Sequence, residues 1–127
     1  MKLVPARALL ALMYMGGVVS LSALPGRRVA RWGLSPRVLD LLHIPLFTGL
    51  ALVTLWAIVA PRRTRALAVF ALLACFAGGD EILQLWVPGR VASLADFARD
   101  ALGIAIGIAA AEALGPVALA LRKESGR

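Results

Sequence analysis

Four long apolar stretches, separated by short polar connections, constrain the fold of this chain most. They cover about residues 8–24, 36–60, 66–87 and 93–121 of the 127-residue chain. A bilayer-spanning helix needs roughly 20 predominantly apolar residues, so each stretch is long enough to cross a membrane. With 61% hydrophobic residues and only seven acids, a soluble domain of this size would lack the polar surface to cover its core. The sequence therefore predicts an all-α membrane protein, in which residues 1–127 form a single domain, a bundle of four transmembrane helices with short loops.

Residues that start and stop helices support these spans. Ser35 followed by Pro36 is typical of an N-cap with proline at the first helical position. The stretch "VPGR", residues 87–90, suits a type II turn, and Ser93 with Asp96 three residues later resembles a capping box. We therefore expect the last two helices to form an antiparallel hairpin with a loop of about six residues.

The positions of Lys and Arg indicate an orientation. With four spans, both termini and the 61–65 loop lie on one side, which carries eight of the 14 Lys and Arg residues, and the other side carries six. The positive-inside rule places the more basic side in the cytoplasm. We therefore expect a multi-pass protein with both termini cytoplasmic.

The net charge of +7 comes from short Arg-rich connections between the apolar stretches. There is no long basic face and no ladder of aromatic residues, which argues against nucleic-acid binding. Anionic headgroups are the simpler partner, so we expect contacts with membrane lipids. No feature of the sequence indicates an oligomeric state.

Polar residues inside the apolar stretches gather toward one face of the membrane. Four spans bring the end of the first helix, the start of the second, the end of the third and the start of the fourth to the same side. Many of these residues are three or four positions apart within a helix, so they share a helix face. Together with two loop residues, they predict a polar pocket. Its residues are Asp40, His43, Asp80, Glu81, Gln84, Arg90, Ser93, Asp96 and Asp100.

Acids at this depth need partners. Five of the seven acids and the only histidine occupy this layer, and a charge near mid-membrane costs at least ~2.5–3.5 kcal/mol. Pairing must relieve part of that cost, and Arg90 and Arg99 are within reach. We expect His43 to partner Asp40, which lies one helical turn away.

A stripe of small residues follows the acids of the last helix. Asp96 and Asp100 are four residues apart, and Gly103 and Gly107 continue the same face. Small residues let one membrane helix approach another closely, so we expect this face to pack against a neighbouring helix. The two aspartates then point into the bundle.

Three segments together resemble a known pattern. They are "SLSALPG" at residues 20–26, "DLLH" at residues 40–43 with Phe47 following, and "GDEILQLWVPGRVASLADFARDALGIAIG" at residues 79–107. This pattern resembles that of the VanZ-like family of small bacterial membrane proteins. The family often has Lys where this chain has Leu41, and usually has Asn where this chain has Asp100.

The resemblance implies a protein of the bacterial cytoplasmic (inner) membrane. The founding member of the family is associated with low-level resistance to teicoplanin-type glycopeptides. Teicoplanin carries a lipid tail and acts outside the cytoplasmic membrane, and the expected orientation puts the polar pocket on that side. We therefore expect the pocket to bind an amphiphilic ligand, such as a lipid-tailed antibiotic or a cell-wall lipid precursor.

Other interpretations stay open. The protein could be a membrane enzyme acting on a lipid-linked substrate, with Glu81 or His43 as general acid or base. The sequence indicates no cofactor and no firm metal site, although acid clusters can hold Mg²⁺ or Mn²⁺, and the lone Cys75 excludes a Cys-based zinc site. The polar layer could instead be a structural salt-bridge network. A proton-coupled transporter is less favoured, because four helices without a repeat are a small scaffold.

Overall fold

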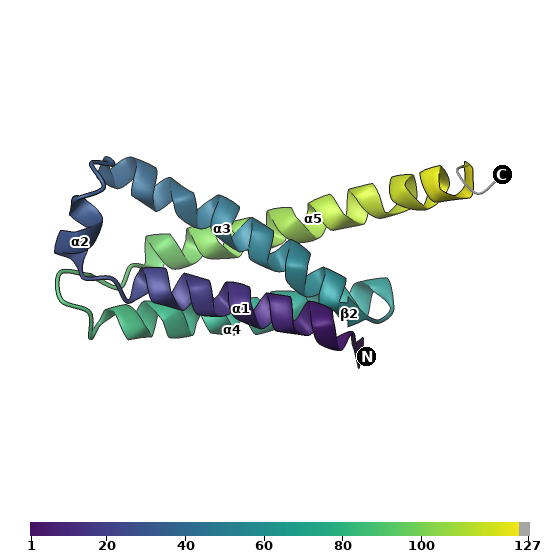
Figure 1. The fold of residues 1–127 in the computed structure, drawn as a ribbon, viewed down its shortest axis with the longest axis horizontal. Helices are drawn as coiled ribbons and strands as arrows, with labels where there is room; N and C mark the ends of the chain where they lie inside the picture. The colour runs from purple at the N-terminus through teal and green to yellow at the C-terminus, as the bar shows by residue number, and fades with distance from the viewer. Residues whose placement is uncertain (125–127) are drawn as a thin grey trace.

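The structure is a computed structural model that describes residues 1–124. Four long helices run along one another, and a short helix crosses one end of them (Figure 1). The elements in chain order are β1 (Lys2–Leu3), α1 (Pro5–Ser22), α2 (Gly26–Ala30), α3 (Pro36–Ala57), β2 (Ile58–Val59), α4 (Arg62–Gln84) and α5 (Leu94–Glu124).

Three of these helices, α1, α3 and α4, are long and apolar enough to cross a membrane. The helix α5 is longer and carries Asp96, Arg99 and Asp100 within its first two turns; it is not among the three candidate spans found in the described residues. Many large apolar side chains of the bundle point outward, among them Leu12 on α1 and Leu67 on α4. Outward apolar faces suit a lipid environment. The chain is therefore a mostly helical, membrane-embedded protein.

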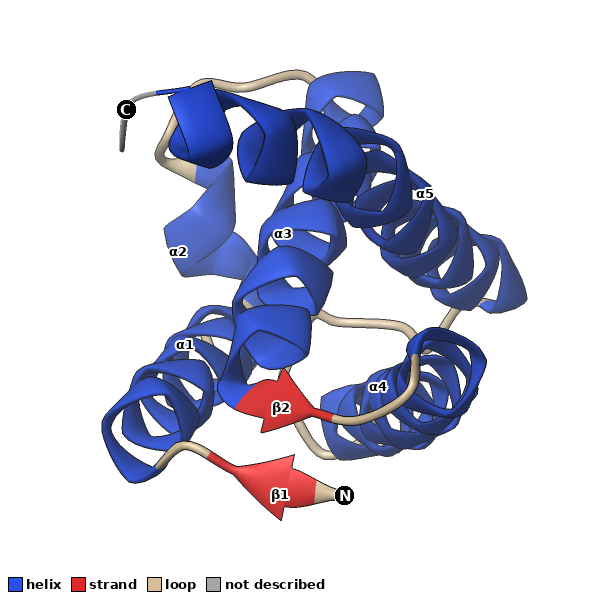
Figure 2. Ribbon diagram, turned by 90° about the vertical axis from the view of Figure 1, so that its right-hand side faces the viewer, coloured by secondary structure: helices blue, strands red, loops and turns tan. Residues whose placement is uncertain are grey.

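The helix α3 occupies the centre of the bundle (Figure 2), where it packs most extensively against α5 and also against α1 and α4. Phe47 and Leu50 of α3 are fully buried, and Leu73 of α4 and Ile104 of α5 join them in one apolar core. This core lies between the two ends of the bundle and holds the helices that carry the polar residues.

Glycine allows α5 to lie directly on the backbone of α3. A Cβ atom at Gly103 would fall 2.5 Å from the carbonyl oxygen of Ile44, and one at Gly107 would fall 2.7 Å from that of Thr48. Real side chains do not tolerate such distances, so only glycine fits. The Thr48 hydroxyl also donates a hydrogen bond to the carbonyl oxygen of Gly103 at 3.0 Å.

The predicted helix N-cap at Ser35 and the predicted turn at residues 87–90 are both confirmed. The Ser35 hydroxyl accepts a hydrogen bond from the backbone N–H of Val38 at 3.4 Å, and α3 begins at the next residue, a proline. In the "VPGR" stretch, Gly89 has a φ of +75°, and the N–H of Arg90 donates to the carbonyl oxygen of Val87 at 3.1 Å. A positive φ at the third position is the mark of a type II turn.

Some helix boundaries differ from the predicted ones. The helix α3 ends at Ala57, three residues early, because residues 58–59 pair antiparallel with residues 2–3 as the strands β2 and β1. This pairing joins segments more than 50 residues apart, so no local signal predicts it. The short helix α2 was likewise not predicted.

The helix α4 starts and ends earlier than the predicted 66–87. It begins at Arg62, because arginine is a good helix former and Pro61 can precede a first turn. It ends at Gln84, since the residue before Pro88 is pushed away from helical backbone angles. The loop before α5 therefore covers residues 85–93 and is longer than predicted.

Candidate functional site

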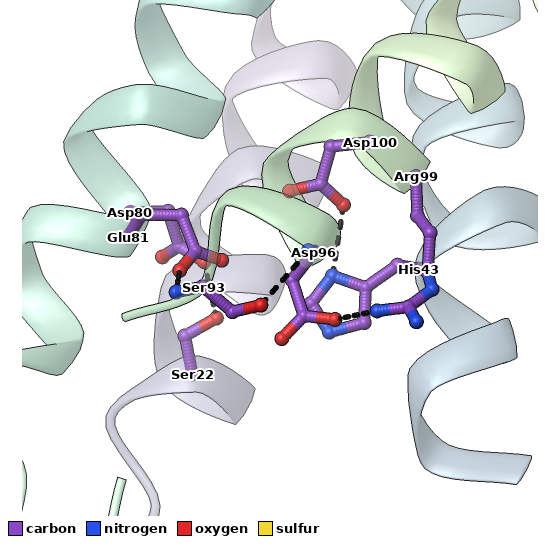
Figure 3. A network of polar contacts seen from close by, with 8 residues as sticks. All are labelled: Ser22, His43, Asp80, Glu81, Ser93, Asp96, Arg99 and Asp100. Carbon is purple, nitrogen blue, oxygen red and sulfur yellow. Dashed lines mark hydrogen bonds and ion pairs between the residues drawn. The ribbon is translucent and has the colours of Figure 1, made fainter. Parts of the chain in front are cut away.

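The structure brings the predicted polar residues together where α1 and α4 end and α3 and α5 begin. Figure 3 shows eight side chains of this group, contributed by these four helices and the loop before α5. Three of the acids are almost completely buried: Asp80 is 5% exposed, Glu81 is 7% exposed and Asp100 is 1% exposed. Each acid has a different set of partners.

Asp80 is bonded to the last residue of α1. The Ser22 hydroxyl donates a hydrogen bond to Oδ2 of Asp80 at 2.5 Å, and both side chains are buried. Ser22 was not among the predicted pocket residues. Ser22 lies at the end of the first helix, at the same depth as the acids, and this position could have predicted it as a pocket residue.

His43 is bonded to Asp100 and not to Asp40, so the predicted pairing within α3 is wrong. Nδ1 of His43 lies 2.8 Å from Oδ1 of Asp100. The cause is the close approach of α5 to α3 at Gly103, which places the aspartate one turn earlier directly opposite the histidine. Asp40 lies instead 3.9 Å from a guanidinium nitrogen of Arg99.

The start of α5 is capped by Ser93 of the preceding loop and by Glu81 of α4. The Ser93 hydroxyl accepts a hydrogen bond from the N–H of Asp96 at 3.2 Å, as a capping box requires. The reciprocal bond differs from the prediction: the N–H of Ser93 donates to Oε2 of Glu81 at 2.6 Å, and the Asp96 carboxylate pairs with Arg99. A carboxylate of α4 thus completes the cap of α5, which ties the two helices together.

Arg90 binds the end of α1. Its Nε donates to the carbonyl oxygen of Leu24 at 3.3 Å, and a terminal nitrogen donates to that of Leu21 at 3.4 Å. Carbonyl groups at a helix C-terminus lack partners within the helix and attract cations. We expected the acids to hold Arg90 in place, whereas α1 does so through its backbone.

Three buried carboxylate oxygens of this group have no hydrogen-bond partner among the described residues. They are Oδ1 of Asp80, Oε1 of Glu81 and Oδ2 of Asp100. Each acid therefore uses one oxygen and leaves the other free, which is costly in a buried environment. Donor atoms of His43, Glu81 and Asp100 lie within 4.8 Å of one another, so these three residues are the ones that could hold a metal ion.

A cavity of about 520 Å³ opens beside these groups. The predicted pocket residues that line it are Asp40, His43, Asp80, Gln84, Arg90 and Asp96. A largely apolar groove of about 600 Å³ adjoins it between α1 and α3, and Val18, Leu21 and Leu46 line both spaces. Glu81 and Ser93 lie outside the cavity and line a smaller hollow beside the start of α5.

The sequence of the chain matches a known family over most of its length. The family model described as VanZ/LLP1 matches residues 2–115. The chain belongs to the VanZ/LLP1 family. Comparisons with curated proteins and with solved structures give no match. The predicted VanZ-like resemblance is therefore confirmed, and the matched region contains every residue of the polar group.

Two positions depart from the VanZ-like pattern, and they lie in different surroundings. Leu41 is exposed on the outer side of α3, away from the polar group. Asp100 is the most deeply buried acid and bonds to His43. An Asn at this position would offer the same acceptor oxygen without the charge. This VanZ/LLP1 chain therefore holds one additional ionisable carboxyl group at the centre of the polar group.

Proposed function

We propose that this VanZ/LLP1 protein binds an amphiphilic ligand, with the polar head in the 520 Å³ cavity and the acyl chain in the adjoining groove. The observation that carries this proposal is that the two spaces are neighbours, one lined by charged groups and the other apolar. Val18, Leu21 and Leu46 form the shared boundary.

The sizes and surfaces of the two spaces favour such a ligand. Sites for small molecules commonly measure about 300–1,000 Å³ and combine apolar walls with a few fixed polar groups. An acyl chain gains about 0.8 kcal/mol for each CH₂ group that it buries, so each group held in the groove adds to the affinity. Arg90 is held by the end of α1, which pre-positions its guanidinium group at the cavity.

The proposed biological role is resistance to teicoplanin-type glycopeptides in a bacterial cytoplasmic membrane. We propose that α5 crosses the membrane with α1, α3 and α4, and that both termini are cytoplasmic. The cavity then opens on the outer side, where a lipid-tailed glycopeptide acts. A cell-wall lipid precursor has the same combination of tail and polar head.

The test compares two neighbouring glycines of α1. Both Gly16 and Gly17 face open space, but only Gly17 lines the groove. In a glycopeptide-sensitive bacterium, the native protein should raise the inhibitory concentration of teicoplanin more than that of vancomycin, which has no tail. Gly17→Leu should abolish this effect because the leucine fills the groove, and Gly16→Leu should retain it at equal membrane levels.

Two results would contradict the proposal. If cells with the native protein respond to both drugs as cells with empty vector do, the resistance role is wrong. If Gly17→Leu protects as well as the native protein, the groove does not hold the tail. Arg90→Ala should reduce protection only in part, since the guanidinium contributes to binding of the head alone.

A second candidate function is an enzyme acting on a lipid-linked substrate. It is favoured by the short separation of His43, Glu81 and Asp100, because neighbouring acids and a histidine suit proton transfer. Glu81→Gln should then stop the conversion of a lipid that accumulates or disappears in membranes with the native protein. An unchanged lipid profile in both strains would rule this candidate out.

A purely structural network is a weaker explanation. A network that only joins helices gains by satisfying all its buried oxygens, and Asp80, Glu81 and Asp100 each leave one unsatisfied. If the network were structural, Glu81→Gln would lower the folded yield in proportion to the lost phenotype. Normal yield with lost protection would favour the binding function.

A further inference from the structure

We propose that His43, Glu81 and Asp100 form a binding site for one divalent first-row metal ion, Mn²⁺ or Zn²⁺. The residues come from three different helices, α3, α4 and α5, which the fold brings together at the acid-rich end of the bundle (Figure 3). The site stands independently of amphiphile binding and goes beyond it.

The distances between the donor atoms suit coordination. One donor atom from each residue lies within 4.8 Å of the other two, and Nδ1 of His43 is 2.8 Å from Oδ1 of Asp100. Two ligands bonded to the same ion at about 2.1 Å are about 3–4 Å apart. Small side-chain movements therefore suffice to place all three around one ion.

Free oxygen atoms provide a second, independent observation. Oε1 of Glu81 and Oδ2 of Asp100 have no partner among the described residues, and both side chains are more than nine-tenths buried. The other oxygen of Glu81 accepts the N–H of Ser93, which holds the carboxylate in position. Ligating carboxylates are commonly oriented by such a hydrogen bond.

A cation would also suit the local charge. When ionised, Glu81 and Asp100 carry two negative charges beside a histidine, in a region where charge is costly. The nearby arginines are engaged elsewhere: Arg99 pairs with Asp96 and Asp40, and Arg90 binds backbone carbonyl groups. A divalent ion with a neutral histidine would cancel both charges.

The type of ligand selects the class of metal. Imidazole nitrogen favours first-row transition metals and zinc, whereas Mg²⁺ and Ca²⁺ prefer oxygen alone. Three protein ligands leave at least one coordination position open. His43 also lines the 520 Å³ cavity, so a water molecule or an oxygen of a bound ligand can complete the coordination from that side.

Mn²⁺ binding to the full-length protein in detergent provides the test. The protein carries an affinity tag without histidine, is stripped with EDTA, and is titrated with Mn²⁺ while electron paramagnetic resonance follows the free ion. We expect about one bound ion per chain and its displacement by Zn²⁺. His43 is the only histidine of the chain, so ¹⁴N coupling to the bound Mn²⁺ identifies the site without any mutation.

Two aspartates of α5 supply a matched pair of variants. Asp100→Asn removes a proposed ligand, whereas Asp96→Asn removes an acid that pairs with Arg99. Asp100→Asn and Glu81→Gln should each weaken Mn²⁺ binding by at least about tenfold, since even outer partners of metal sites contribute that much. Asp96→Asn should bind Mn²⁺ as the native protein does.

Three outcomes would overturn the proposal. They are a folded native protein that binds neither Mn²⁺ nor Zn²⁺, a bound Mn²⁺ without ¹⁴N coupling, and equal binding by Asp100→Asn and Asp96→Asn. If a variant does not fold, the ¹⁴N measurement on the native protein decides alone. A native protein that protects against teicoplanin but binds neither Mn²⁺ nor Zn²⁺ would reject this site and leave the proposed function standing.

Discussion

The two ends of the bundle differ in how their acidic and basic side chains are paired. The acidic end contains Asp40, His43, Asp80, Glu81, Asp96 and Asp100. The basic end contains Lys2, Arg7, Arg62, Arg65 and Glu112. Acids outnumber the cations that bind them at the first end, and cations outnumber acids at the second.

At the basic end, charged side chains join neighbouring helices. The Arg7 guanidinium lies 4.5 Å from the ring centre of Trp56 and donates to its carbonyl oxygen at 3.3 Å. Glu112 of α5 pairs with both Arg62 and Arg65 of α4, so its carboxylate has a cation beside each oxygen. These pairs join neighbouring elements and place two arginines beside the acid, although Oε1 of Glu112 has no hydrogen-bond partner among the described residues.

At the acidic end, Asp80, Glu81 and Asp100 also each keep a buried oxygen without a hydrogen-bond partner, but none of the three pairs with an arginine among the described residues. The helices α4 and α5 are thus joined at one end by an acid with two arginine partners, whereas at the other end three buried acids have no arginine partner. The proposed binding functions rest on this difference.

The largest expected effect comes from separating the helices that build the acidic end. Gly103→Leu forces a side chain against the backbone of α3 at Ile44, and it should lower the free energy of unfolding by about 3 kcal/mol. Gly16→Leu enters open space and should change it little. Unfolding in detergent with increasing SDS measures both. Equal stability of the two variants would mean that α5 does not lie on α3 as described.

A smaller effect should distinguish the two ends directly. Asp100→Asn weakens a partly buried bond to His43 and should cost about 1–2 kcal/mol in the same unfolding assay. Glu112→Gln removes partly exposed ion pairs at the basic end and should cost less than about 1 kcal/mol. The reverse order would contradict the contrast between the two ends.

The smallest effect concerns two serines of α1. Ser22→Ala removes the buried bond to Asp80 and should cost about 0.6 kcal/mol, the mean for hydrogen bonds between membrane helices. Ser20→Ala removes only an exposed bond to the carbonyl oxygen of Gly16 in its own helix, and should leave stability unchanged. If both variants match the native protein, Ser22 does not anchor Asp80.

Much of this protein follows from its sequence alone. The lengths of the apolar stretches predict the helices, and Ser35 and the "VPGR" turn predict where helices begin and end. The spacing of acids and glycines predicts which helix faces lie against each other. These features are local, because they depend on residues within a few turns of one another. The family pattern is also carried by short segments, which explains why it could be recognised without a structure.

Only the tertiary structure decides which polar groups pair. His43 meets Asp100 because α5 lies on α3 at Gly103, and Glu81 caps α5 because α4 ends beside Ser93. The strands β1 and β2 likewise join distant segments. Such pairs depend on how helices approach and rotate against each other, whereas sequence spacing reports only neighbours within one helix. The unpartnered oxygens of Glu81 and Asp100, on which the proposed metal site rests, likewise follow only from the tertiary structure.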